Sequence, residues 1–288
     1  MHNNSKTKKN KTSLLKETWH RLNKNKLAIL GLYFLVFMIL VALFAPIIAP
    51  YHFDDLNQDK AFKFPNREFW FGTDNFGRDI LSRMIYGSRV SLQVGLISVG
   101  FSALVGCTLG VIAAFYRKCD NLVMRVVDGF ASIPYLLLAI AIAAALGSGI
   151  NNLMLAVGIS TIPAYARVTR AAVLTVKESD YVEAARSIGT NNFRIIIRHI
   201  MPNSLAPIII QATLGVGNAI LIASCLSFLG LGIQPPSPEW GAMLSGGRIY
   251  IRDYWYMTVI PGFALMLVVY ALNILGDGFR DALDPRLK

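Results

Sequence analysis

The chain has 288 residues, of which 54% are hydrophobic, and its mean hydropathy of +0.49 exceeds that of ordinary soluble domains. This composition excludes a soluble globular protein and predicts an all-α integral membrane protein. The net charge of +11 is explained by membrane insertion and anionic lipid, so we predict no nucleic acid partner.

Six apolar stretches can cross a bilayer as helices, which takes about 20 residues each. The first, Leu27–Ala49, carries no charge and is too long for a cleaved signal segment. The others cover residues 90–116, 122–147, 150–168, 204–230 and 255–275. Gly106 and Gly110 predict close approach between helices. Pro134 and Pro163 predict kinks, which suit a moving gate but also occur in static membrane helices.

The positive charges predict the orientation of these spans. Residues 1–26 hold eight Lys and Arg residues, and we expect a disordered start followed by a short interfacial helix containing Trp19. With this tail in the cytoplasm, an even number of spans also places the tail at 277–288 there. Of the 28 Lys and Arg residues, 20 are then cytoplasmic, as the positive-inside rule requires.

Residues 50–89 form a segment that is too long for a simple turn, and we expect an extracellular subdomain. Its second half reads "FGTDNFGRDILSRMIYGSRVSL". Asp74 or Asn75 can start a helix that ends at Gly87. Its apolar face would consist of Ile80, Leu81, Met84 and Ile85. This predicts an amphipathic helix across the outer mouth, which either braces the bundle or contacts substrate.

Metal, disulfide and catalytic chemistry find little support in the sequence. Cys107, Cys119 and Cys225 are scattered, so thiols buried or at the membrane edge are expected rather than a zinc site or a disulfide. The histidines at positions 2, 20, 52 and 199 lie far apart and form no metalloprotease motif. A membrane-embedded enzyme is therefore disfavoured, and no metal site is predicted.

A polar and mostly basic island, residues 167–201, separates the fourth and fifth apolar stretches and is predicted to be cytoplasmic. Asp180 and Glu183 form a capping pair, so a short helix can begin at Tyr181. It would run through Ala184 and Ala185 and stop at Gly189. Because alanine side chains let a partner approach the backbone closely, this helix is predicted to be a docking element.

A second short helix follows in the same island, capped by Thr190 or Asn191. Its predicted apolar face recurs at i, i+3, i+4 and i+7 and consists of Phe193, Ile196, Ile197 and Ile200. Arg194 and Arg198 point away from this face, and Pro202 is expected to separate the helix from the fifth span. The alternative for the whole island is an amphipathic loop that rests on lipid headgroups.

Four motifs carry a family resemblance. The stretch "EAARSIGTNNFRIIIRHIMPN" resembles the EAA signature of ATP-binding-cassette (ABC) importer permeases, and "YARVTRAAVLTVKESDYVEAARSIG" resembles their peptide/nickel/opine branch. The C-type member of that branch is suggested by "FGTDNFGRDILSRMIYGSRVSL", "SFLGLGIQPPSPEWGAML" and "NILGDGFRDALDPRL". The similarity covers roughly residues 20–288. His199 and Met201 depart from the general signature, which has Ile and Leu there.

The resemblance implies a six-helix, type I ABC importer permease in a bacterial plasma membrane, with a five-helix core at 90–276. Such a permease is non-catalytic and binds no cofactor itself. Its expected partners are a homologous second permease, two cytoplasmic ATPases that hold ATP and Mg, an external substrate-binding protein and membrane lipid. The chain indeed lacks a phosphate-binding G-x-x-x-x-G-K-[ST] loop. Residues 181–189 would be the coupling helix that docks on an ATPase.

The expected substrates are small peptides or peptide-like metal chelates, such as nickel, cobalt or zinc with an opine-type metallophore. The alternative is di-/oligopeptides or glutathione only. Gln211, Asn218 and Ser224 are candidates for the substrate path, although hydrogen bonding between helices is an equal alternative. A secondary transporter is the more distant alternative, and it should place charges or broken helices at mid-membrane. Here the charges are expected at span ends, at Arg125, Asp128, Arg167 and Asp277.

Overall fold

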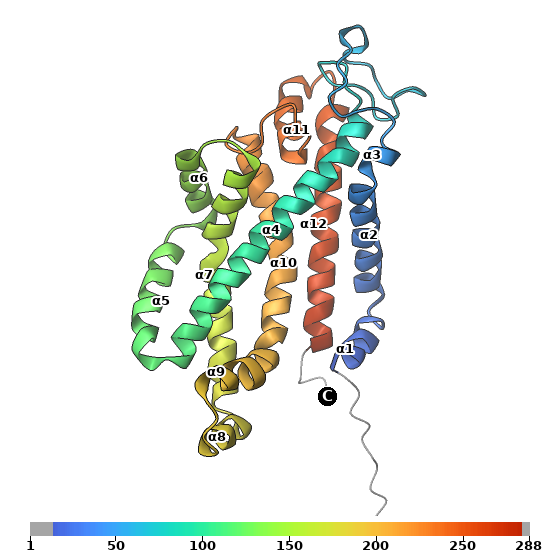
Figure 1. The fold of residues 1–288 in the computed structure, drawn as a ribbon. Coiled ribbons are helices and arrows are strands. Elements are labelled where there is room, and N and C mark those ends of the chain that lie inside the picture. Colours follow the sequence, from blue (N-terminus) through green and yellow to red (C-terminus); the bar gives the residue numbers. More distant parts are fainter. Residues whose placement is uncertain (1–13, 284–288) are drawn as a thin grey trace, which may run out of the picture.

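The computed structural model describes residues 14–283 as a bundle of long helices with short helices at both ends (Figure 1). This confirms the all-α prediction for these residues. The predicted disordered start and the last five residues of the predicted C-terminal tail lie outside the described part of the chain.

The N-terminal region begins with α1 (Leu14–Leu22), the predicted interfacial helix, in which Trp19 is exposed. Asn25 then caps α2 (Lys26–Leu43) by accepting a hydrogen bond from the backbone N–H of Ala28. The first span is shorter than predicted, because the helix ends at Phe44 and a separate turn, α3 (Ala45–Ile48), follows.

Four helices in the described part of the chain are long and apolar enough to cross a membrane. These are α2, α4 (Ile80–Phe115), α10 (Met201–Phe228) together with the turns before it, and α12 (Tyr256–Leu283). A fifth span results if the bent pair α5 (Arg117–Ala131) and α6 (Tyr135–Leu146) counts as one. The 28-residue α7 (Ile150–Lys177) is long enough but carries more polar residues. The helix α12 continues to Leu283, so the tail predicted from residue 277 is largely helical.

The predicted helix across the outer mouth is wrong in its bounds. Asp79 caps α4, with its Oδ2 atom accepting from the backbone N–H of Ser82 at 2.8 Å. The helix then passes through Gly87 without a stop and forms the start of the second span, ten residues earlier than predicted. Gly87 is needed for packing, because a Cβ atom there would lie 3.0 Å from the Trp240 ring.

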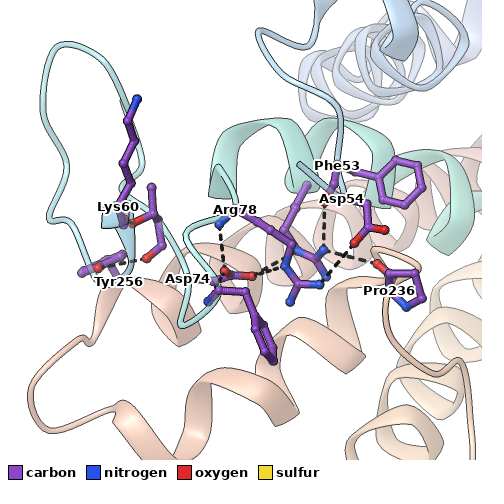
Figure 2. Close-up of polar contacts among 10 residues, drawn as sticks. Phe53, Asp54, Lys60, Asp74, Arg78, Pro236 and Tyr256 are labelled. Atoms are coloured by element: carbon purple, nitrogen blue, oxygen red, sulfur yellow. Dashed lines mark hydrogen bonds and ion pairs between the residues drawn. The ribbon is translucent and has the colours of Figure 1, made fainter. Parts of the chain in front are cut away.

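Asp74 is not a helix start but the centre of the outer segment's polar contacts, drawn in Figure 2. Its carboxylate accepts from the N–H groups of Phe76 and Arg78 and pairs with Arg78 Nε at 2.7 Å. Arg83, on α4, donates from Nη1 to the carbonyls of Phe53 at 3.0 Å and Pro236 at 3.3 Å. These bonds hold the segment at residues 50–79 against α4 and the loop after α10.

The short helix α11 (Trp240–Gly247) closes the same end of the bundle. Glu239 caps it, because the carboxylate accepts from the N–H groups of Gly241 at 2.9 Å and Ala242 at 2.8 Å. Burial raises the pKa of the Glu239 carboxyl, against the opposing effect of these bonds. Trp240 donates from Nε1 to the Met84 carbonyl at 3.1 Å, which fastens α11 to α4.

The glycines at 106 and 110 bring α4 and α7 into close contact, as predicted. A Cβ at Gly106 would lie 2.6 Å from the Tyr165 Cβ, and one at Gly110 would lie 2.6 Å from the Ala166 carbonyl oxygen. The close packing of α4 against α7 fixes the position of α7 behind the cavity described below.

Cys107, Cys119 and Cys225 are all free thiols.

Candidate functional site

The predicted docking helix is present as α8 (Asp180–Ser187), at the same end of the bundle as α1 and the end of α12 (Figure 1). Its N-cap is Ser179 rather than Asp180, and no side chain makes a capping hydrogen bond. Its end is as predicted: Gly189 has a φ of +78°. The N–H of Gly189 donates to the Arg186 carbonyl, and that of Thr190 to the Ala185 carbonyl. This is a Schellman motif, which favours glycine at this position.

The two alanines of α8 point in different directions, which corrects the prediction that both face a partner. Ala184 is exposed, whereas Ala185 is only 6% exposed and belongs to a cluster inside this chain. The buried members of that cluster are Ala114, Phe115, Val173, Val182, Ala185, Ile195 and Ile200. Glu183 is exposed and free to meet a partner. The available face of α8 is therefore narrower than predicted.

A clamp joins α8 to the ends of α4 and α7. Lys177 donates from Nζ to the carbonyls of Ala114 at 2.8 Å and Phe115 at 3.0 Å, at the C-terminal end of α4. The cations of Lys177 and Arg186 lie 5.5 Å and 5.7 Å from the centre of the Phe115 ring. These contacts attach the predicted docking helix α8 firmly to the bundle.

The second helix of the loop differs from the prediction. Asn191 caps α9 (Asn192–Ile195) by accepting from the Arg194 N–H, as expected. A π-helical turn then covers Ile196–Ile200 and leads directly into α10, so Pro202 does not separate the two. Because a π turn takes an extra residue, Ile195 and Ile200, five apart, are fully buried.

The π-helical turn shifts the helical register and so changes which side chains are exposed. Phe193 is 72% exposed and Ile197 is 54% exposed, whereas Ile200 is fully buried, so the residues of the predicted apolar face do not share one environment. Ile196 is partly buried, and Arg194 and Arg198 point outward as expected.

The second candidate feature is a cavity of about 320 Å³ at the break between α5 and α6. The two helices meet at an angle of 86° near Pro134, so the predicted kink is a complete break. Pro134 is the N-cap of α6 and makes no capping side-chain bond. Irregular backbone at membrane depth requires protein or water around it. The cavity lies at this break, and its volume is within the range of ligand sites.

Two of the three predicted path residues line this cavity. Gln211 and Asn218 lie on the same side of α10, and neither side-chain amide makes a hydrogen bond among the described residues. Gly215 lies between them, and a Cβ there would overlap the Tyr165 hydroxyl. Ser224 is not part of the cavity. It is buried and donates to Glu239 Oε1 at 3.3 Å, so the alternative of bonding between structural elements holds for this residue.

Arg167, expected at a span end, also lines the cavity. It lies inside α7, where its Nη2 atom donates to Asp128 Oδ1 of α5 at 2.7 Å. Nearer the end of α7, Arg170 makes two hydrogen bonds to Asp120, of 2.7 Å and 2.6 Å. A broken helix beside a cavity is a feature that the secondary transporter alternative also predicts, so it does not separate that class from an ABC importer permease.

One exposed residue beside the docking helix and one capping residue at the opposite end of the bundle escaped sequence reasoning. Ile188, beside Gly189, is 82% exposed, and a large apolar residue next to a helix stop was its only signal. Glu239 lies in the quoted "PPSPEWGAML" stretch, and its position before Trp-Gly-Ala was the signal for a cap.

Comparison with known families distinguishes an ABC importer permease from a secondary transporter. Residues 106–288 match the family described as "binding-protein-dependent transport system inner membrane component". The chain belongs to this family. Residues 13–65 match the N-terminal transmembrane domain of oligopeptide transport permease C, which confirms the resemblance to C-type permeases of the peptide branch.

Curated relatives agree over nearly the whole chain. A dipeptide transport system permease of Alkalihalophilus pseudofirmus is 48% identical over 274 residues, covering 95% of this chain and 90% of the relative. A glutathione transport system permease of Pectobacterium atrosepticum is 41% identical over 275 residues, covering 95% and 91%. A solved inward-facing methionine ABC transporter, MetNI, has a TM-score of 0.59 at 18% identity, covering 71% and 98%. That last likeness shows the fold alone.

Proposed function

We propose that this chain is one of two homologous permease subunits of a bacterial ABC importer for di-/oligopeptides or glutathione-like peptides. The observation that supports it is the 41% to 48% identity to dipeptide and glutathione permeases over 95% of the chain. The relatives' names give no support to the metal-chelate part of the sequence-based expectation. The other partners are two cytoplasmic ATPases, which hold ATP and Mg, and an external substrate-binding protein.

Six spans are part of the proposal. To the four apolar spans and the bent pair α5–α6 we add α7, whose 28 residues extend about 42 Å at 1.5 Å per residue. Its arginines at 167 and 170 are paired with carboxylates of α5, which is how charges are accommodated within a membrane bundle. The end that carries α1, α8 and the end of α12 faces the cytoplasm, in keeping with the positive charges (Figure 1).

In this proposal α8 docks on an ATPase through its exposed face, formed by Glu183, Ala184, Ile188 and Gly189. An acid in the first turn of a helix suits a basic or hydrogen-bonding partner. Closure of the ATPase pair would move the clamped island at residues 167–201, the coupling loop of this proposal, as a rigid body and switch the bundle between inward-open and outward-open states. The cavity lined by Gln211 and Asn218 is the substrate path.

The test is uptake by a reconstituted importer containing this chain, its second permease, both ATPases and the binding protein. We expect ATP-dependent accumulation of labelled dipeptide or glutathione and none of a nickel chelate. Accumulation of the chelate alone would contradict the proposed substrate class. Uptake by this chain in vesicles without ATP would support the secondary transporter instead.

A further inference from the structure

The cavity at the α5–α6 break combines three polar groups that match the parts of a peptide. Gln211 and Asn218 carry unpaired side-chain amides, each with one acceptor oxygen and two donor hydrogens. A peptide bond offers the complementary donor and acceptor without regard to side chain. Arg167 lies on the wall contributed by α7 and brings a guanidinium to the cavity, ion-paired on one side with Asp128.

The dimensions suit a short peptide. Gln211 and Asn218 are seven residues apart on α10, or about 10 Å along the helix at 1.5 Å per residue. An extended chain advances about 3.3–3.6 Å per residue, so two or three residues cover this distance. The cavity volume of about 320 Å³ is small enough to exclude a long folded segment.

Arg167 has hydrogen-bonding capacity to spare. Among the described residues only its Nη2 atom is engaged, with Asp128, and about half of its side chain is exposed. A guanidinium carries five N–H donors in a planar fork that fits a carboxylate. Asp128 fixes the orientation of the fork and leaves its remaining donors available.

We propose that Arg167 is the carboxylate subsite of this cavity and binds the C-terminal carboxylate of a peptide in transit, while Gln211 and Asn218 bind its main-chain amides. The inference rests on the proposed function and adds the group that distinguishes a free peptide from its amide. The carboxylate is common to all unmodified peptides, so the subsite recognises them irrespective of sequence. Any side-chain selectivity would then lie outside these three residues.

The test uses Ala164, an exposed residue of the cavity wall, changed to Cys in an importer whose other cysteines are Ser. The rate of thiol modification is measured in the purified full complex, with alanyl-alanine or its C-terminal amide added. We expect the dipeptide to protect the thiol at a concentration about tenfold lower than the amide. Arg167→Gln should abolish that preference, and Arg167→Lys should retain part of it.

Arg125→Gln is the matched control, because Arg125 is an exposed arginine of α5 that makes no hydrogen bond or ion pair among the described residues. It should leave the preference unchanged. If the dipeptide and its amide protect the thiol equally when Arg167 is unchanged, the proposed subsite is wrong. It is also wrong if Arg167→Gln and Arg125→Gln lose the preference for the dipeptide equally. Dipeptide uptake by the wild-type importer is measured in parallel, so a failure of the proposed function would be recognised separately.

Discussion

The glycine stop of α8, the proposed coupling helix, allows a quantitative prediction. A Cβ atom at Gly189 would meet nothing within 4 Å, so a substitution there changes only backbone energy. Its φ of +78° costs an L-residue about 1–2 kcal/mol. Alanine also restricts the unfolded chain more than glycine does, and this effect offsets about 0.4–1 kcal/mol of that cost. Gly189→Ala should therefore destabilise the end of α8 by about 1 kcal/mol, roughly a fivefold change in local opening.

Hydrogen exchange of the assembled importer is the assay. The amides of Gly189 and Thr190 close the Schellman motif, and in Gly189→Ala they should exchange about fivefold faster; Gly189→Asn should show a smaller effect, since Asn tolerates this region better. Gly129→Ala is the control, because Gly129 is also in open space but lies inside α5 without a positive φ. Unchanged exchange in Gly189→Ala, or equal acceleration in both variants, would refute the assigned motif.

Three further predictions concern the docking face, the outer mouth and the topology. Ala184→Trp should assemble normally yet lower the substrate uptake per ATP hydrolysed. Ala185→Trp should instead overpack its buried cluster and lower the free energy of unfolding by about 1–3 kcal/mol. Full uptake by Ala184→Trp would show that α8 is not a docking helix. Trp240→Phe loses the N–H that binds the Met84 carbonyl and should lower the Tm by about 2–4 °C in thermal unfolding. Thr190→Cys should resist an impermeant thiol reagent in intact cells, and strong labelling from outside would reverse the proposed topology.

Local sequence chemistry predicted the parts of the coupling loop that depend on neighbouring residues. The stop at Gly189 and the cap at Asn191 both follow from side chains or glycine within a few positions. The buried face after Asn191 could not be predicted, because a π turn has a different period from the α-helix assumed in the pattern. Ile195 and Ile200 are buried as a result, and Phe193 is exposed.

Contacts between distant segments were beyond the sequence pattern. Arg83 binds carbonyls 30 and 153 positions away, and nothing near it in sequence indicates either partner. Pro134 did predict a bend, but the 86° break depends on how α6 packs against α7 and α10. Arg167 was expected at a span end because hydropathy places the end of the fourth span at residue 168, although α7 continues to Lys177.

The helix α4 joins the two functional ends of the molecule. Its 36 residues extend about 54 Å and include no proline, whereas α7 and α12 each contain one and α10 contains two. At the cytoplasmic end of the proposed topology, Lys177 binds its last carbonyls. At the other end, the Met84 carbonyl holds Trp240. Because an uninterrupted helix resists sharp bending, a displacement of the clamped coupling loop would be transmitted to the outer mouth mainly through α4, while the proline-containing spans beside it can bend around the cavity.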